Sequence, residues 1–377
     1  MLVHIPDHFS SSFIFDFSKC PTSKTDRSSV LKSLIKIVCG FCLLILGGFE
    51  LLSFIKSGGQ NLESIFAIII ILLALSIIIS SFSSITRYKK FYFDGKKFDI
   101  TYKSSLSASY FASVPLEEYE GVRLRILFAQ NGIINKYKYI IDLYHKDNNK
   151  IVPLYISKYR SNLIKIWYEY AKALGLPALS INERGVVRRE CVDLEKNLRE
   201  LSLENKLPFI ASGKLPAPKF INVIENKLST LVKSVGVHPD SCTYWSIFVL
   251  VLSVTVLISS VVLLFKNNTM PSSGIGALYI LLISVIIYSL LSIFSTTQYE
   301  ISKNSISLKL YFSKHLLRER VIDMNNIKNV ELSYSPVTGR YGIAIIENDE
   351  IYLIEEKLPA SDVLWLKDFL IRKIVGN

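Results

Sequence analysis

Four long apolar runs divide the chain, and they occur in two pairs. They cover Leu34–Ile55 and Ser64–Ile85, then Tyr244–Phe265 and Gly274–Phe294. An apolar helix of about 20 residues is long enough to cross the hydrocarbon core of a bilayer. Because backbone groups in lipid must form their hydrogen bonds within the segment, such runs are expected to be helices. The pattern therefore predicts four transmembrane helices arranged as two hairpins.

A polar block with strand-like alternation follows each pair of apolar runs. Ile306, Leu308 and Leu310 alternate with polar residues, which is typical of a strand with one face on a core. The first block ends in Leu163–Leu174, and the second ends in Val363–Ile374; both stretches repeat apolar residues at helical spacing. Each block is predicted to contain six or seven short antiparallel strands that curl into a small barrel, followed by one C-terminal helix.

The two blocks align with each other, which indicates an internal repeat. At one constant spacing, Val114, Leu116, Tyr119 and Val122 correspond to Ile322, Met324, Ile327 and Val330. At a slightly shorter spacing, Ile151, Leu163, Ile166, Tyr170 and Leu174 correspond to Ile351, Val363, Leu366, Leu370 and Ile374. The difference places extra residues of the first block between Val122 and Ile151, where a longer hairpin loop costs little free energy.

The order of apolar hairpin, strands and closing helix resembles the bacterial pleckstrin-homology-like membrane proteins. The segments that carry the resemblance are Tyr299–Ile301, Val321–Val330 and Gly342–Ile346, with the closing helix of the second block. The resemblance implies two tandem copies of a membrane hairpin and a pleckstrin-homology-like barrel on the cytoplasmic side. It also implies membrane-tethered modules that share no common enzymatic activity.

These patterns divide the chain into six segments. They are an N-terminal cytoplasmic segment (1–33), a first hairpin (34–86), a first barrel domain (87–175), a helical connector (176–243), a second hairpin (244–296) and a second barrel domain (297–377). Within the connector, a heptad stripe from Val187 to Leu201 predicts a charged helix that docks on a neighbouring domain, with self-association as the alternative. Another apolar stripe, Phe220–Val235, predicts a helix lying on the membrane surface.

Charge and cysteine usage define the predicted location. The chain has 44 Lys and Arg against 32 Asp and Glu, a formal net charge of +12. Basic residues precede the first apolar run and follow the second, and the short loop inside each pair has only one Lys. Both termini and both polar blocks are therefore predicted to be cytoplasmic. The five cysteines show no disulfide framework. With no cleavable signal peptide predicted, we expect an integral protein of the bacterial cytoplasmic membrane.

Two groups of residues are candidates for a binding role. Basic side chains around the first predicted strands form a candidate contact for anionic lipid headgroups, against the alternative of ordinary solvated strand edges; they are Lys89, Lys90, Lys96, Lys97 and Lys103. Glu50 is a candidate intramembrane polar site, because a carboxylate inside an apolar span is costly. It also lies close enough to the predicted outer end of its span to reach the interface.

The sequence favours a scaffold over an enzyme. It has no nucleotide-binding loop, nucleophile elbow or zinc signature, so no catalytic residue, cofactor or metal is predicted. The predicted function is an interaction platform that presents its two barrels to membrane lipid and to protein or peptide partners, or to another copy of itself. No nucleic-acid partner is expected. The alternative is a transporter or channel component built from the duplicated hairpins.

Overall fold

A computed structural model describes most of the chain in two compact units. The described residues are 10, 12–57, 61–104, 108–131, 134–159, 162–182, 185–207, 216–234, 241–267, 273–336, 339–348, 350–355 and 358–376. Unit 1 comprises Met1–Arg123 and Ile140–Lys158, and unit 2 comprises Leu124–Tyr139 and Tyr159–Asn377.

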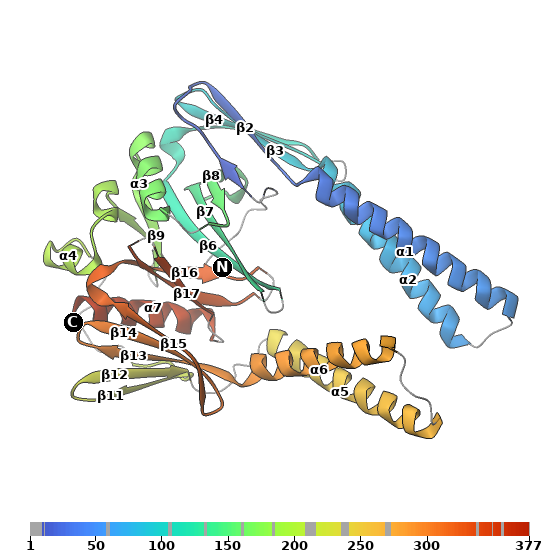
Figure 1. Ribbon diagram of the computed structural model, residues 1–377. Coiled ribbons are helices and arrows are strands. Elements are labelled where there is room, and N and C mark those ends of the chain that lie inside the picture. Colours follow the sequence, from blue (N-terminus) through green and yellow to red (C-terminus); the bar gives the residue numbers. More distant parts are fainter. Residues whose placement is uncertain are drawn as a thin grey trace. The chain divides into compact units, whose positions relative to one another are not determined.

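Seven α-helices occur among the described residues (Figure 1). They are α1 (Val30–Ser57), α2 (Asn61–Thr86), α3 (Leu163–Leu174), α4 (Leu198–Leu203), α5 (Ser241–Asn267), α6 (Ser273–Phe294) and α7 (Ala360–Val375). The prediction that the four apolar runs are helical is confirmed, since they lie in α1, α2, α5 and α6. Three short 3₁₀ turns used below are η1 (Leu116–Glu118), η3 (Cys191–Leu194) and η4 (Met324–Asn326).

The prediction of four transmembrane helices is wrong. Within the described residues, only Val30–Leu52 of α1 is both long and apolar enough to cross a membrane. The apolar stretches Ile70–Thr86 of α2 and Ser246–Ser259 of α5 are shorter than the roughly 20 residues that a crossing needs. The predicted localisation, an integral inner-membrane protein with four crossings and cytoplasmic termini, is therefore also overturned, because its topology was derived from four crossings.

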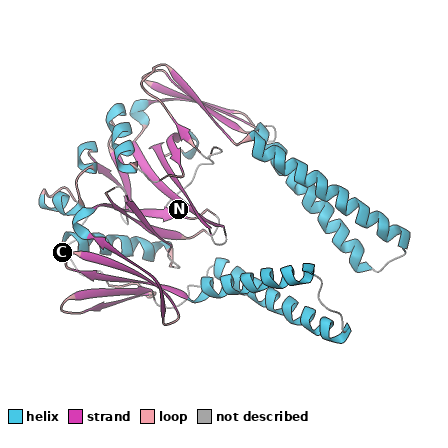
Figure 2. Cartoon of the chain, viewed as in Figure 1, coloured by secondary structure: helices cyan, strands magenta, loops and turns pink. Residues whose placement is uncertain are grey.

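The strands are mostly short and antiparallel (Figure 2). Those of unit 1, in whole or in part, are β1 (Phe13–Ile14), β2 (Thr22–Arg27), β3 (Tyr88–Phe93), β4 (Lys97–Lys103), β5 (Tyr110–Pro115), β6 (Gly121–Asn131), β7 (Ile134–Tyr144) and β8 (Val152–Ser157). Those wholly in unit 2 are β9 (Ala178–Asn182), β10 (Gly185–Arg189), β11 (Ile221–Glu225), β12 (Ser229–Ser234), β13 (Ser295–Ser302), β14 (Ser305–Phe312), β15 (His315–Asp323), β16 (Ile327–Tyr334), β17 (Tyr341–Glu347) and β18 (Glu350–Glu355).

The order of elements repeats along the chain. The first series is β2, α1, α2, β3, β4, β5, η1, β6, β7, β8, α3, with an additional 3₁₀ turn at Asn148–Lys150 between β7 and β8. The second series is β12, α5, α6, β13, β14, β15, η4, β16, β17, β18, α7. The aligned positions Val114 and Ile322 are both buried near the ends of corresponding strands, and Val122 and Val330 are both buried in the strands after the 3₁₀ turn. The repeated pattern of apolar residues thus builds the same succession of elements twice.

In unit 1, the four strands β2–β3–β4–β5 form one antiparallel sheet. Phe91 and Phe93 of β3 and Phe98 and Ile100 of β4 are buried on one face, as strand alternation requires. The ring centroids of Phe93 and Phe98 lie 4.4 Å apart in a stacked arrangement. The segment before β2 adds Phe13, Phe15 and Phe17 to the same aromatic core.

In unit 2, β11–β12–β13–β14–β15 form a five-stranded antiparallel sheet, and β16–β17–β18 pair antiparallel in another. One core connects these strands with α7, whose Val363, Leu366 and Leu370 are buried in it. Buried residues of both sheets and of α4 complete the core. Burying this apolar surface is what fixes the C-terminal helix on the strands.

The predicted barrels are wrong, because the described strands form three sheets and none of them closes. The physical reason lies at the sheet edges. The outer edge of β13 is covered by β12, and β2 covers β3 in the same way. Inside unit 2, β16 pairs in parallel with β6 through Ser333–Ile126 and Tyr334–Leu127. Strands that already have neighbours on both sides cannot pair with each other to complete a cylinder.

The helical connector is also wrong in its details. Val187 lies in β10, Cys191 and Leu194 lie in η3, and only Leu198 and Leu201 of the predicted stripe are in an α-helix. The predicted surface helix is instead the hairpin of β11 and β12, from Ile221 to Ser234, and its last predicted residue, Val235, lies outside the described residues. Its apolar residues include Ile221 and Val232, which are buried in the core of unit 2. Apolar spacing in these short stretches satisfied a helical pattern, but tertiary pairing selected strands.

Candidate functional site

Small side chains fill the interface of the α1–α2 hairpin. Gly40 and Gly47 of α1 and Ala74 and Ser81 of α2 are buried. A Cβ atom added at Gly40 would lie 2.7 Å from Ile78 Cγ1 and 3.3 Å from the Ala74 carbonyl oxygen, so the two helices approach closely there. Small residues at a helix contact let backbones approach and are enriched where helices pair in lipid.

Large apolar side chains cover the outside of the same hairpin. Exposed residues of α1 include Leu34, Ile35, Val38, Phe41, Ile45, Leu46 and Phe49, and exposed residues of α2 include Leu72, Leu73, Ile79 and Phe82. This is the reverse of a helix pair that hides its apolar residues from water. A continuous apolar surface of this kind marks a contact with lipid or with another protein.

The base of the hairpin is fastened to the sheet of unit 1. Arg27, the last residue of β2, donates from Nη2 to the Ile85 carbonyl oxygen (3.0 Å). Ser28 donates from Oγ to the Ser84 carbonyl oxygen (2.6 Å). Since β2 leads into α1 and α2 leads into β3, these bonds hold the first rows of the sheet against the ends of both helices (Figure 1).

The first rows of the sheet carry cations and aromatic rings. We name this set the basal band: Arg27, Tyr88, Lys89, Lys90, Tyr102, Lys103, Tyr110 and Phe111. Cross-strand register places Arg27, Tyr88 and Lys103 in one row, and Lys89, Tyr102 and Tyr110 in the next. Lys90 and Phe111 flank Thr101 in the third row. Opposite residues in a sheet share a face and lie close enough to act together.

The outward cations of the basal band are Arg27, Lys90 and Lys103, which are all exposed. Lys89 faces the other side, where its Nζ lies 5.9 Å from the centre of the Tyr102 ring. The buried residue Asp26 is the register partner of Lys89. The exposed face therefore holds three cations beside exposed aromatic rings such as Phe111.

The structure separates the five predicted lysines into two groups. Lys89, Lys90 and Lys103 belong to the basal band at the helical end of the sheet. Lys96 and Lys97 lie at the opposite end, around the β3–β4 turn, where Asp94 accepts hydrogen bonds from both backbone amides. Five residue steps separate the Tyr88 row from the Phe93 row, which corresponds to about 17 Å. The five lysines therefore do not form one patch.

Glu50 lies on the exposed surface of α1, towards its C-terminal end. It is not among the small buried residues that form the contact with α2. The structure thus gives this carboxylate no position inside the helix pair.

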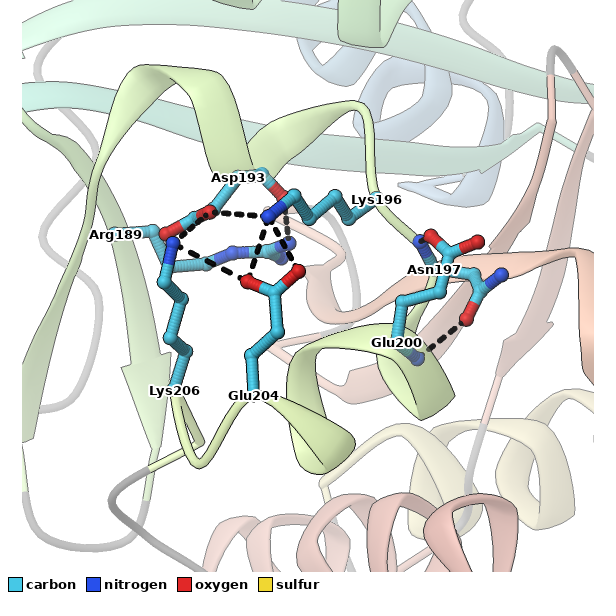
Figure 3. A network of polar contacts seen from close by, with 7 residues as sticks. All are labelled: Arg189, Asp193, Lys196, Asn197, Glu200, Glu204 and Lys206. Carbon is cyan, nitrogen blue, oxygen red and sulfur yellow. Dashed lines mark hydrogen bonds and ion pairs between the residues drawn. The ribbon is translucent and has the colours of Figure 1, made fainter.

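A polar network in unit 2 was not anticipated from the sequence (Figure 3). The carboxylate of Asp193 in η3 is paired with Lys206 (2.8 Å) and Lys196 (3.6 Å). Glu204, just after α4, pairs with the same two lysines at 3.3 Å and 2.6 Å. Burial raises the pKa of Asp193, but the hydrogen bonds and charges of Lys206 and Lys196 outweigh it, so the pKa lies below its ordinary value. This network fastens η3 to the end of α4.

Next to this network, Arg189 is almost fully buried and donates from Nη2 to the Asp193 carbonyl oxygen (2.7 Å). Burial lowers its pKa, while the negative charges of Glu331 and Asp193 act in the opposite direction. Lys367 of α7 lies 3.5 Å from Glu331 of β16 and 3.3 Å from Ser180 Oγ. These buried charges connect β9, β10, β16 and α7.

Arg199 of α4 binds three separate segments of unit 2. Its Nε donates to the Ile374 carbonyl oxygen (2.8 Å), and Nη2 donates to the Lys303 carbonyl oxygen (2.8 Å). Nη1 donates to the side chain of Asn325. The guanidinium therefore joins α4 to the C-terminal end of α7, the β13–β14 turn and η4. These contacts have a structural role, since they saturate the side chain with internal acceptors.

Neither set of polar residues has the arrangement of a catalytic centre. Within the described part of the chain, no group of three or more His, Cys, Asp or Glu side chains is placed to hold a metal ion. The carboxylates of the unit 2 network are already paired with lysines. The surface best suited to contact another molecule is the basal band with the apolar hairpin above it.

Comparison with known proteins gives no family assignment. The chain matches no family model, and no curated protein matches it. The resemblance to bacterial pleckstrin-homology-like membrane proteins therefore stays a prediction.

Proposed function

We propose that the protein is a lipid-binding scaffold, whose α1–α2 hairpin contacts acyl chains and whose basal band contacts anionic headgroups. The observation that carries the proposal is the reversed packing of the hairpin, with small residues inside and large apolar residues outside. In water that surface would be costly to expose, at about 25 cal/mol for each Å². In lipid it has no such cost, and close packing of small residues supplies the contact between helices.

The basal band supports the proposal because of where it lies. Aromatic and basic side chains favour the boundary between acyl chains and headgroups, since their apolar stems and rings face the lipid and their charges face water and phosphate. Arg27 and Lys103 lie in the first cross-strand row at the base of the hairpin, and Lys90 lies two rows further along. The sheets of unit 2 then supply surface for protein partners, as expected of a scaffold rather than an enzyme.

The experiment uses single-cysteine variants of the full chain, with the five native cysteines replaced by Ser. A fluorescent label is placed at Ile35 or Leu46 on the outside of α1, and at Lys97 as the control at the far end of the sheet. After reconstitution into vesicles, we expect nitroxide on the acyl chains to quench the two α1 labels and aqueous iodide to quench the Lys97 label. Equal quenching of all three labels by iodide would contradict the proposal.

A further inference from the structure

Strand β15 is the last strand of the five-stranded sheet in unit 2. It pairs with β14, and no other described strand pairs with it. The backbone N–H of Asp323 points away from β14, because it donates to the Glu347 carboxylate (3.2 Å). Outward and inward amides alternate along an antiparallel strand, so the N–H groups of Val321 and Glu319 also point outward. They are available to a further strand.

Apolar side chains accompany this edge. Leu316, Leu317 and Val321 are 48%, 52% and 63% exposed. A register shift opposite Leu310 and Tyr311 places a bulge at Leu317, which limits regular pairing to Arg318 onwards. Proteins usually protect an exposed edge of this length with charges or bulges. Here the bulge at Leu317 interrupts only the beginning of the β15 edge, and the strand is regular from Arg318 onwards.

Positive charge occupies the middle of the edge. Arg318 and Arg320 lie on the same face of β15, and no carboxylate of the described residues lies within ion-pair distance of either guanidinium. Arg320 instead lies over the Tyr352 ring, 5.6 Å from its centre. Glu319 accepts from Ser307 (2.7 Å) and pairs with Lys309 (3.5 Å). The carboxylates of Asp323, which caps η4, and of Glu347, which accepts from the Asp323 amide, lie at the end of the strand.

A second copy of the chain is a poor partner for this edge. Antiparallel pairing about a two-fold axis centred on Arg318, Glu319 or Arg320 places that residue opposite its own copy. A register centred on Val321 places Glu319 opposite Asp323. Each of these registers brings like charges together, and like charges directly opposite each other destabilise a sheet. These four registers therefore disfavour self-association through the edge.

We propose that the β15 edge binds an extended acidic segment of a partner protein, which adds to the sheet as a sixth strand. In this binding mode the main chain supplies hydrogen bonds, and alternate side chains supply specificity. The outward backbone N–H groups of Glu319 and Val321 donate the main-chain hydrogen bonds to this segment. Asp or Glu at two alternate positions of the segment pair with Arg318 and Arg320, while an apolar residue on the other face contacts Val321. The surface and the ligand differ from those of the lipid contact.

The test measures binding of a labelled synthetic peptide to the full chain in nanodiscs by fluorescence anisotropy. The peptide has eight residues, with Glu alternating with Val or Thr. We expect R318E/R320E to weaken binding at least tenfold and to bind a peptide with Lys in place of Glu. The matched control K219E/K227E makes the same change of charge elsewhere in unit 2 and leaves the affinity unchanged.

A backbone-specific control keeps the protein unaltered. Methylating alternate amide nitrogens of the peptide, on the edge that faces β15, removes the main-chain bonds and is expected to abolish binding. The proposal is overturned if the methylated peptide binds as well as the parent, or if K219E/K227E weakens binding as much as R318E/R320E. It is also overturned if the wild-type chain prefers anionic vesicles to the peptide through the two arginines, or forms a dimer that R318E/R320E disrupts.

Discussion

The basal band gives the sharpest test of lipid binding, because the chain contains its own matched control. Lys90 and Lys103 lie near the hairpin base, and Lys96 and Lys97 lie at the other end of the same sheet. Replacing either pair by Gln removes two positive charges from exposed sites of unit 1. The two double variants therefore have the same net charge and differ in the distance of the change from the proposed lipid surface.

The expected magnitudes follow from that distance. A cation at an anionic membrane surface contributes about 1 kcal/mol, so losing Lys90 and Lys103 costs about 2 kcal/mol, which corresponds to roughly 30-fold in lipid preference. The other pair lies about 17 Å further away, and screening over a Debye length of about 10 Å at 0.1 M salt reduces its effect to roughly twofold.

The assay reconstitutes the full chain with spin-labelled phosphatidylserine or phosphatidylcholine. The fraction of each lipid immobilised at the protein surface gives a relative association constant. We expect K90Q/K103Q to lose most of the preference for phosphatidylserine and K96Q/K97Q to keep it, with the difference shrinking at about 1 M salt. The reasoning is refuted if both variants lose the preference equally, or if the wild-type chain shows none.

Three further predictions concern stability, each measured as the free energy of unfolding of the full chain. Gly40→Ala should destabilise the α1–α2 contact by about 1–3 kcal/mol through overpacking. At Gly48 no atom lies within 4 Å of an added Cβ, so Gly48→Ala should be neutral or stabilising by up to about 1 kcal/mol. Equal effects of the two substitutions would exclude a close approach of the helices at Gly40. Arg199→Lys should cost about 2 kcal/mol, because one ammonium cannot reach three acceptors, while Arg188→Lys on the exposed surface should cost less than about 0.5 kcal/mol. The pKa of Asp193 is lowered in the folded state, so its contribution to stability is present above the unfolded pKa of about 3.9 and is lost as the pH falls through the folded pKa. Asp193→Asn should therefore reduce the loss of unfolding free energy between about pH 5 and pH 2. An unchanged dependence on pH would contradict the pairing of Asp193 with its lysines.

Short apolar stretches were the hardest part to predict. The spacing of Phe220, Ile224, Leu228 and Leu231 satisfies a helical period, yet Ile224 and Leu231 are register partners in a β-hairpin. Over so few residues, helical and strand patterns overlap, and the pairing of β12 with β13 decided between them. The predicted barrels failed for the same reason. β12 pairs with the outer edge of β13, and a closed barrel would have needed that edge.

The candidate site shows a similar limit. Lysines close in sequence were grouped together, but the β3–β4 turn sends Lys96 and Lys97 to the far end of the sheet. Arg27 was overlooked as a member of the band because it lies 62 positions before Lys89, and only the register of β2 with β3 brings it alongside. Thr22–Arg27 is polar throughout and has no apolar alternation, so no local pattern indicated this neighbour.

The sequence alone determined the features that depend on local pattern. The apolar runs were expected to be helical because a long apolar segment satisfies its backbone hydrogen bonds internally only as a helix. The alternation in each polar block favoured strands because that period puts the apolar residues on one face. The repeat also determined the order of elements. The tertiary structure decided which strands pair, that the sheets stay open, and which charges share a surface. Those outcomes depend on contacts between residues far apart in the chain, which no local periodicity specifies.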